Sequence, residues 1–392
     1  MIIGIMGTPI ESSNLGCMAL TYSLLMELEK VSKRLGVAFE YIIFDGSDNF
    51  RAKEEICRPL NIAEDKLISG YMSMLYNPLR IIKNFGKTAK MFIGIKKCDC
   101  IIDITGGDSF SDIYGSVTFF GRTRVKRLIE CMKKPLMLAP QTYGPFQSKR
   151  SQKVAAMVIK NASCVLTRDS FSMEVIKQLT GRSAVCCADM AFVLPYEKRV
   201  SETDKIKVGI NVSKLLYSDD SEVPERNFRL TTDYRTFIDG LISYLTNDDR
   251  FEVYMIPHVG LDHEVHCELK KKYESIQLVQ PVTNPIEMKS IIGGMDVFVG
   301  ARMHGAIAAF TTGTACIPTA YSRKFNGLFK DLGYEVLIDL LELDTDKAIQ
   351  KTIYYIENRE NVKEQVNACR PVKDAKIQSM EMALEEWLRE VK

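Results

Sequence analysis

Short apolar runs alternate with longer amphipathic stretches along most of the sequence. The first unit consists of an apolar run at Ile2–Met6, a glycine-containing loop, an amphipathic stretch over residues 18–35 and a second apolar run at Glu40–Phe44. Apolar runs that are separated by helical patterns are typical of parallel strands joined by helices. The alternation therefore predicts an α/β fold built from parallel sheets.

The alternation occurs as two successive series, and 392 residues are more than a single hydrophobic core usually serves. A polar, charged segment at residues 196–207 separates the two series and is the best candidate for a linker. We predict two doubly wound Rossmann-like domains that face a cleft, one over residues 1–196 and one over residues 207–372. Residues 373–392 are predicted to form a C-terminal helix.

Composition argues against several classes of protein. The formal net charge of +2 does not indicate a nucleic-acid-binding protein. No stretch approaches the roughly 20 apolar residues of a membrane span, and the N-terminus starts as a strand without a signal-peptide pattern. The 11 cysteines show no repeating frame, which favours free thiols. We therefore expect a cytoplasmic protein without a nucleic-acid partner.

The segment at residues 300–305, Gly-Ala-Arg-Met-His-Gly, is the strongest candidate for a catalytic site. An apolar run precedes it and a run of small residues follows it, which predicts a buried strand, a turn and the first turn of a helix. The start of a helix favours an anion. Arg302 offers a planar fork to phosphate or carboxylate, and His304 can carry a proton near neutral pH. The alternative is that His304 is a core histidine.

Several other glycine, polar and charged residues follow predicted strands, where doubly wound sheets bind ligands. The candidate binding residues are Asn14, Gly16, Gly106, Gly107, Asp112, Gln141, Arg168, Asp189, His258, Tyr321 and Lys324. Asn14 and Gly16 are equally compatible with a turn that binds nothing. Arg168 and Asp169 are equally compatible with a structural ion pair or a helix cap.

The spacing of His258, His263 and His266 resembles that of metal ligands. No cluster of carboxylates or cysteines completes a coordination set, and His263 and His266 are expected at exposed positions of a polar helix. We therefore predict no metal and no cofactor.

Residues 67–98 contain six basic residues and no acidic residue. The basic residues of this stretch are Arg80, Lys83, Lys87, Lys90, Lys96 and Lys97, and a second cluster contains Arg122, Arg124, Lys126 and Arg127. Basic stretches with interleaved aromatic residues can rest on anionic lipid, here the inner membrane surface. A solvated helix face over the core is the commoner explanation.

With these motifs together, the chain resembles the polysaccharide pyruvyl transferases. The resemblance covers roughly residues 2 to 330 and lies in an ordered set of motifs: Asn14-Leu15-Gly16 with Ala19, Thr105-Gly106-Gly107 with Asp112, residues 141–145, Thr167-Arg168-Asp169 with Ser172, Asp189, Pro257-His258 and residues 300–305. The chain departs from the family pattern at Asp108, where many members have a third glycine.

The resemblance implies a two-domain fold like that of the GT-B glycosyltransferases. It also implies transfer of a pyruvyl group from phosphoenolpyruvate to a glycan or lipid-linked sugar, usually as a cyclic ketal with release of phosphate. Arg302 and His304 would bind phosphoenolpyruvate on the second domain, and Arg168 would be a second anion contact. Asp108, Asp112 and Asp189 would contact the acceptor sugar or act as a base.

Two other functions fit the same outline. The first is a nucleotide-sugar glycosyltransferase of GT-B shape, which would bind a nucleotide. The second is a non-catalytic glycan-binding relative, which would release no phosphate with any acceptor.

Overall fold

The computed structural model describes residues 1–46, 50, 53–73, 84–113, 115–198, 203–218 and 229–392. The chain divides into two compact units by its internal contacts. Unit 1 consists of Met1–Ser12, Leu20–Met190 and Asp374–Lys392, and unit 2 consists of Ser13–Ala19 and Ala191–Lys373.

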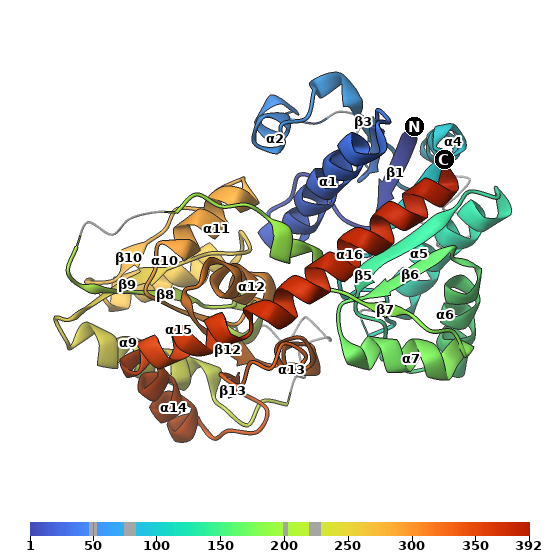
Figure 1. Ribbon diagram of the computed structural model, residues 1–392. Helices are drawn as coiled ribbons and strands as arrows, with labels where there is room; N and C mark the ends of the chain where they lie inside the picture. Colours follow the sequence, from blue (N-terminus) through green and yellow to red (C-terminus); the bar gives the residue numbers. More distant parts are fainter. Residues whose placement is uncertain (47–49, 51–52, 74–83, 114, 199–202, 219–228) are drawn as a thin grey trace. The chain divides into compact units, whose positions relative to one another are not determined.

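A seven-stranded parallel sheet forms the centre of unit 1 in the residues that the structure describes (Figure 1). In spatial order its strands are β3 (Leu67–Gly70), β2 (Glu40–Phe44), β1 (Ile2–Met6), β4 (Cys100–Asp103), β5 (Leu136–Gln141), β6 (Cys164–Thr167) and β7 (Val185–Cys186). The chain moves outward from β1 to β3 and then returns to the other side of β1, so the sheet is doubly wound.

Helices cover both faces of this sheet, as parallel strands require. The helices are α1 (Leu15–Leu35), α2 (Lys53–Leu60), α4 (Phe85–Lys97), α5 (Ser116–Cys131), α6 (Lys149–Asn161), α7 (Ser170–Thr180) and α16 (Arg370–Val391), with a 3-10 turn at Glu64–Lys66. A second 3-10 turn, Met190–Val193, begins at the last residue of this segment of unit 1 and continues into unit 2. Side chains of α4, α5 and α6 join those of the strands in one apolar cluster. Helix α16 runs beside α1 (Figure 1), where Arg34 pairs with Glu385 over 3.2 Å, and Trp387 on α16 donates to Oγ of Ser163 over 2.8 Å.

The described part of unit 2 contains a second doubly wound parallel sheet. Its six strands, in spatial order, are β10 (Gln277–Leu278), β9 (Phe251–Met255), β8 (Ile206–Asn211), β11 (Val297–Gly300), β12 (Ala315–Ala320) and β13 (Ile338–Asp339). The helices are α8 (Lys214–Tyr217), α9 (Tyr234–Thr246), α10 (Asp262–Lys272), α11 (Pro285–Gly293), α12 (Met303–Thr312), α13 (Arg323–Lys330), α14 (Thr345–Glu357) and α15 (Arg359–Ala368). The two sheets confirm the predicted α/β class with two Rossmann-like folds.

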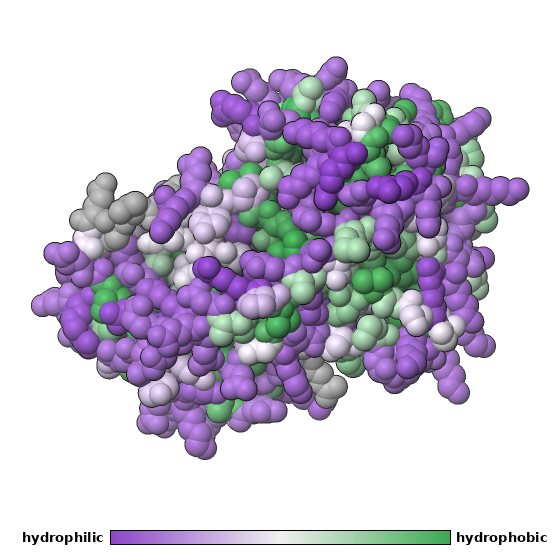
Figure 2. All heavy atoms as spheres, in the orientation of Figure 1, coloured by the Kyte–Doolittle hydropathy of each residue, from purple (hydrophilic) through white to green (hydrophobic). Residues whose placement is uncertain are grey.

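Helix ends follow ordinary capping chemistry. Asp169 caps α7, Asp233 caps α9 and Asp344 caps α14, and in each helix the carboxylate accepts a backbone N–H from the first turn. Gly313 ends α12 in the left-handed conformation, with φ of 81°. On the face shown in Figure 2, hydrophilic residues predominate and hydrophobic residues gather in separate groups. Among the described residues, no helix is long and apolar enough to cross a membrane.

Candidate active site

The segment at residues 300–305 lies at the point where the strand order of the unit 2 sheet reverses. Strand β11 is fully buried between β8 and β12, and its last residue, Gly300, lies beside Asn211 at the end of β8. Arg302 is the N-cap residue of α12, and His304 lies in its first turn. The predicted strand, turn and helix start are confirmed. Ligands of doubly wound sheets bind at this position.

Arg302 is held by a carboxylate that the motif does not contain. Its Nε and Nη2 donate to the two oxygens of Asp262, over 3.0 Å and 2.6 Å. Asp262 is fully buried, whereas the Arg302 side chain keeps 18% of its surface exposed. The backbone N–H of Arg302 donates to Oδ1 of Asn211 over 3.1 Å. The guanidinium is therefore fixed along one edge, and Nη1 is the terminal nitrogen that does not bind Asp262.

The first turn of α1 lies against His304. A Cβ added to Gly16 would lie 2.8 Å from Cγ of His304, and still closer to its Nδ1. Asn14 caps this helix, since its Oδ1 accepts the N–H of Cys17 over 3.2 Å. The same segment pairs with the chain after β9, where the N–H of Gly260 donates to the carbonyl of Ser13 over 2.8 Å. Gly16 therefore lies directly against His304. Asn14 positions α1, the helix that carries Gly16.

His258 is the second imidazole of the site. It follows β9, is 5% exposed, and its ring packs against Gly305, where an added Cβ would lie 3.4 Å from Cδ2. Burial lowers the pKa of His258 to about 3, and the positive charges of His304 and Arg302 add to this against the opposing effect of Asp262. His258 is therefore neutral at physiological pH.

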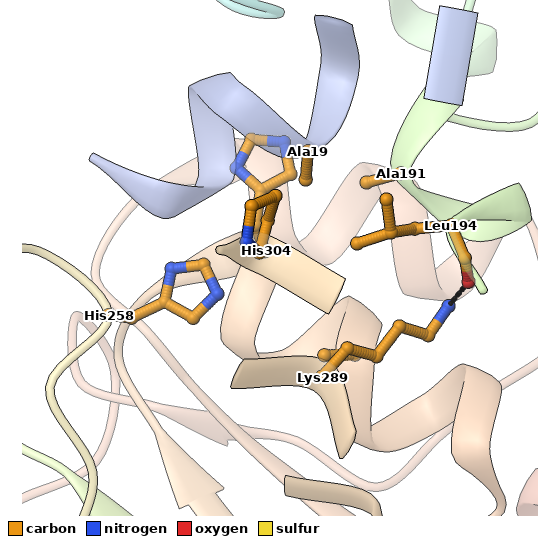
Figure 3. A pocket seen from close by; sticks show the side chains of 8 residues that line it. Ala19, Ala191, Leu194, His258, Lys289 and His304 are labelled. Atoms are coloured by element: carbon orange, nitrogen blue, oxygen red, sulfur yellow. Dashed lines mark hydrogen bonds between the residues drawn. The ribbon is translucent and has the colours of Figure 1, made fainter. Parts of the chain in front are cut away.

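A small cavity brings the two histidines together with a buried lysine (Figure 3). Its volume is about 10 Å³. The cavity is lined by Ala19, Ala191, Leu194, His258, Pro285, Lys289, His304 and Ala308. A volume of this size holds about one water molecule. Lys289, on α11, is 3% exposed and its Nζ donates to the carbonyl of Leu194 over 2.6 Å. Burial lowers the pKa of Lys289 to about 7, and the nearby Lys373 acts in the same direction.

Asp262 and Lys289 were missed by sequence reasoning. Asp262 begins α10, and its only sequence signal is an acidic residue at a predicted helix start. Lys289 lies among Met288, Ile291 and Ile292, so a lysine on an otherwise apolar helix face was the available signal. Neither residue belongs to a recognisable motif.

The remaining candidates of unit 2 follow β12. Tyr321 is half-buried, and its ring centre lies 5.6 Å from that of Phe325. Burial lowers the pKa of Arg302, and Asp262 and Tyr321 raise it. Tyr321 is thus near Arg302. The side chain of Lys324 lies outside the described part of the structure, as does that of Arg323.

In unit 1, Arg168 is engaged in a buried network. It is 2% exposed, its Nη1 donates to Asp189 over 2.7 Å, and its Nε donates to Oγ1 of Thr142 over 2.8 Å. Asp169 is instead the cap of α7, where it accepts the N–H of Ser172 over 2.7 Å. Arg168 therefore forms a buried ion pair, as the structural alternative proposed, but its partner is Asp189 and not Asp169.

The other unit 1 candidates surround the same network. Gly106 and Gly107 have φ of 63° and 77°, and a Cβ on Gly107 would lie 3.0 Å from Nη1 of Arg168. Gln141 is buried and its Nε2 donates to the carbonyl of Asp103 over 3.1 Å. Asp112 accepts the N–H of Gln147 over 2.8 Å. These residues therefore shape the carboxyl edge of the unit 1 sheet.

The expectation that His263 and His266 are exposed was wrong. His263 is half-buried, and His266 is fully buried, because α10 turns this side of the helix toward the unit 2 core. Its Nε2 lies 3.3 Å from the N–H of Val212, and burial lowers its pKa to about 4. Among the residues that the structure describes, no group of three or more metal-binding side chains is present.

Comparison with known proteins identifies the family of the chain. The family model for polysaccharide pyruvyl transferase matches residues 14–323, which include the candidate residues from Asn14 to Tyr321. The chain belongs to the polysaccharide pyruvyl transferase family. Membership implies a transferase, as the family resemblance of the motifs predicted.

A curated relative and several solved structures support the family and the fold respectively. The amylovoran biosynthesis protein AmsJ of Erwinia amylovora is 24% identical over 308 residues, which cover 69% of each chain. UDP-GlcNAc 2-epimerase from Neisseria meningitidis matches with a TM-score of 0.59 at 10% identity, over 99% of each chain. The enzyme of the same name from Methanocaldococcus jannaschii matches with a TM-score of 0.54 at 12% identity, over 91% of this chain and 93% of that chain. At such low identity the two structures support only the GT-B-like fold, which confirms the predicted fold class.

Proposed function

We propose that this member of the family transfers the pyruvyl group of phosphoenolpyruvate to a sugar of a surface polysaccharide or its precursor. The observation that carries the proposal is the position of His304, in the first turn of α12 beside Arg302 and on a cavity shared with His258 and Lys289. The family match supports the reaction class, and the name of AmsJ supports the polysaccharide context.

Phosphoenolpyruvate carries a phosphate and a carboxylate, so its site needs oriented donors and positive charge. The first-turn N–H groups of α12 supply donors and the positive end of a helix dipole. Arg302 supplies a charge whose orientation Asp262 fixes, which lowers the entropic cost of binding an anion. We assign the donor substrate to this end of α12.

The reaction begins with proton transfer to the methylene carbon of phosphoenolpyruvate. A C–H bond forms and positive charge develops at the carbon that carries the phosphate ester. A sugar hydroxyl attacks that carbon and loses its proton, the C–O bond to phosphate breaks, and a second hydroxyl attacks to close the ketal and loses its proton. One proton is consumed and two are released, of which phosphate can take one. We assign the first proton transfer to His304 as the general acid.

His258 and Lys289 complete the site in different ways. His258 stays neutral, so its ring can accept or donate a hydrogen bond without adding a second positive charge beside His304. Lys289 lies on the other side of the cavity, where its Nζ donates to the carbonyl of Leu194. Both would position a substrate anion or a water molecule and would not transfer the proton to carbon.

Phosphate release from phosphoenolpyruvate, measured against a panel of free and lipid-linked glycans, tests this function. We expect release that depends on one class of acceptor and on phosphoenolpyruvate. Transfer of a sugar from a nucleotide sugar would identify the glycosyltransferase alternative, and glycan binding with no phosphate release for any acceptor would identify the non-catalytic one. Either result would overturn the proposal.

A further inference from the structure

Helix α4 of unit 1 has an outward face that the catalytic account does not use. Its inward residues Met91 and Ile95 are fully buried in the apolar cluster of the sheet. Its outward residues include three large apolar side chains, Phe85, Phe92 and Ile93, which are 72%, 43% and 55% exposed. The inward face accounts for the stability of the helix in the fold, so the outward aromatic residues need another explanation.

The charge of α4 has a single sign. The 13 residues of the helix include Lys87, Lys90, Lys96 and Lys97 and no acidic residue. Lys90 donates to the hydroxyl of Tyr71 over 3.0 Å, and the next carboxylate along the chain, Asp99, accepts the N–H of Ile2 over 2.7 Å. A solvated helix usually mixes acidic with basic residues. The combination of exposed aromatic residues and lysines is typical of a surface that meets anionic lipid.

The neighbouring helix in the same cluster extends this surface. Side chains of α5, among them Phe119 and Val125, pack in the cluster that holds Met91 and Ile95, so both helices cover one face of the sheet. Val117, in the first turn of α5, is 64% exposed, and the helix also exposes arginines at positions 124 and 127. Of the other basic residues predicted for this surface, Lys126 is instead buried and pairs with Asp103 over 3.0 Å, and Arg80 and Lys83 lie outside the described residues.

We propose that the outward face of α4, defined by Phe85, Phe92, Ile93, Lys96 and Lys97, docks the protein on an anionic lipid bilayer. The lysines would contact headgroup phosphates while the apolar side chains enter the boundary between headgroups and acyl chains. This is peripheral contact, because no described helix is suited to cross a membrane. The inference does not depend on the proposed reaction, since binding is measured without substrate.

Co-sedimentation of the full chain with vesicles tests the docking surface. We expect binding to vesicles of equimolar phosphatidylglycerol and phosphatidylcholine at low salt, weak binding to phosphatidylcholine alone, and loss of binding as the screening length falls with added salt. The double variant Lys96→Gln with Lys97→Gln should lower the partition coefficient about 25-fold, because each lysine near the surface contributes about fivefold. The variant Phe92→Ser with Ile93→Ser should lower it by about tenfold or more.

A matched control removes the same charge from another helix end. Lys271 and Lys272 are exposed residues at the end of α10 in unit 2, as Lys96 and Lys97 are at the end of α4, and their double glutamine variant should bind the vesicles like the unaltered protein. All variants should show the far-ultraviolet circular dichroism of the parent. Absence of binding at low salt, equal loss in the α10 variant, or binding to a soluble polyanion in place of vesicles would each overturn the proposal.

Discussion

At the residue scale, Gly16 determines how closely the backbone of α1 approaches the imidazole of His304. Gly16 is the second residue of α1, a helix position at which glycine has no intrinsic advantage over alanine, so a glycine here needs a reason in packing. The reason is the contact with His304, where a Cβ would need space that the ring occupies.

We predict that Gly16→Ala displaces His304 and lowers phosphate release by about tenfold or more, since small misplacements of a reacting group are costly. Gly86→Ala is the matched control, because Gly86 also lies in a helix and a Cβ there meets nothing within 4 Å. The control should keep full activity. Equal activity of both variants in the phosphate-release assay would show that the contact has no catalytic effect.

The pair of Arg302 and Asp262 yields a second prediction. Asp262→Asn removes the charge that compensates a largely buried guanidinium, which should lower the free energy of unfolding by about 3 kcal/mol. Urea denaturation monitored by circular dichroism measures this change. Asp239→Asn, which removes a carboxylate that pairs with the exposed Lys272, serves as control and should cost about 1 kcal/mol or less. A similar cost for both variants would contradict the assigned importance of the buried pair.

The motif itself could be predicted from the sequence, and its partners could not. The apolar run before Arg302 and the small residues after His304 determine a strand, a turn and a helix start, so local pattern was sufficient. Asp262 and Lys289 reach the site through tertiary packing of separate helices, which no local spacing indicates. Burial of His266 was missed for the same reason, because the packed side of a short polar helix is set by its neighbours.

At the scale of elements, a buried lysine ties α11 to the chain at Leu194. Lys289 donates to the carbonyl of Leu194, and burial together with the nearby Lys373 lowers its pKa. Because its folded pKa is lowered to about 7, the unfolded chain binds the lysine proton at pH values between 7 and the ordinary lysine pKa, while the folded chain does not.

The free energy of unfolding should therefore rise with pH from about 7 toward about 10, by up to about 1.4 kcal/mol per pH unit from this group. Lys289→Met should flatten the rise, although it also leaves a carbonyl unpaired and lowers stability overall. Lys271→Met, at an exposed position of α10, should leave the slope unchanged. Identical slopes for the protein and Lys289→Met, measured by urea denaturation across this pH range, would refute the role of Lys289.

The strand ends of unit 1 show where element-level prediction stops. The sequence predicts that glycines and charged residues gather at the carboxyl edge of the sheet, and the structure brings Gly107, Arg168 and Asp189 together there. The sequence did not indicate that Arg168 and Asp189 satisfy each other in a buried pair. Which charged side chains form an ion pair depends on their positions in the folded structure, and the strand and helix patterns of a sequence do not give these positions.

At the scale of the whole molecule, the alternation of apolar and amphipathic stretches predicted two doubly wound sheets. Periodicity along the chain could not indicate that the segment Ser13–Ala19 belongs with unit 2, or that Asp374–Lys392 belongs with unit 1. Both assignments depend on contacts between segments far apart in the sequence. The segment with Ser13 belongs to the proposed site, because it carries Gly16, which lies against His304.

Ligand binding should be visible in the stability of the whole chain. A ligand that binds only the folded state at about 100 times its dissociation constant stabilises it by about 2.7 kcal/mol. We expect phosphoenolpyruvate to raise the thermal midpoint by differential scanning fluorimetry, and nucleotide sugars to leave it unchanged. The reverse pattern would favour the nucleotide-sugar alternative.

The most direct test of the central claim is phosphate release from phosphoenolpyruvate by His304→Asn, with the acceptor that supports turnover. If His304 protonates the methylene carbon, the variant should lose at least about 100-fold in turnover, as expected for a general acid, and keep its circular dichroism spectrum. His263→Asn, on a half-buried histidine of α10, should retain the parent rate. Undiminished phosphate release by His304→Asn would contradict the account.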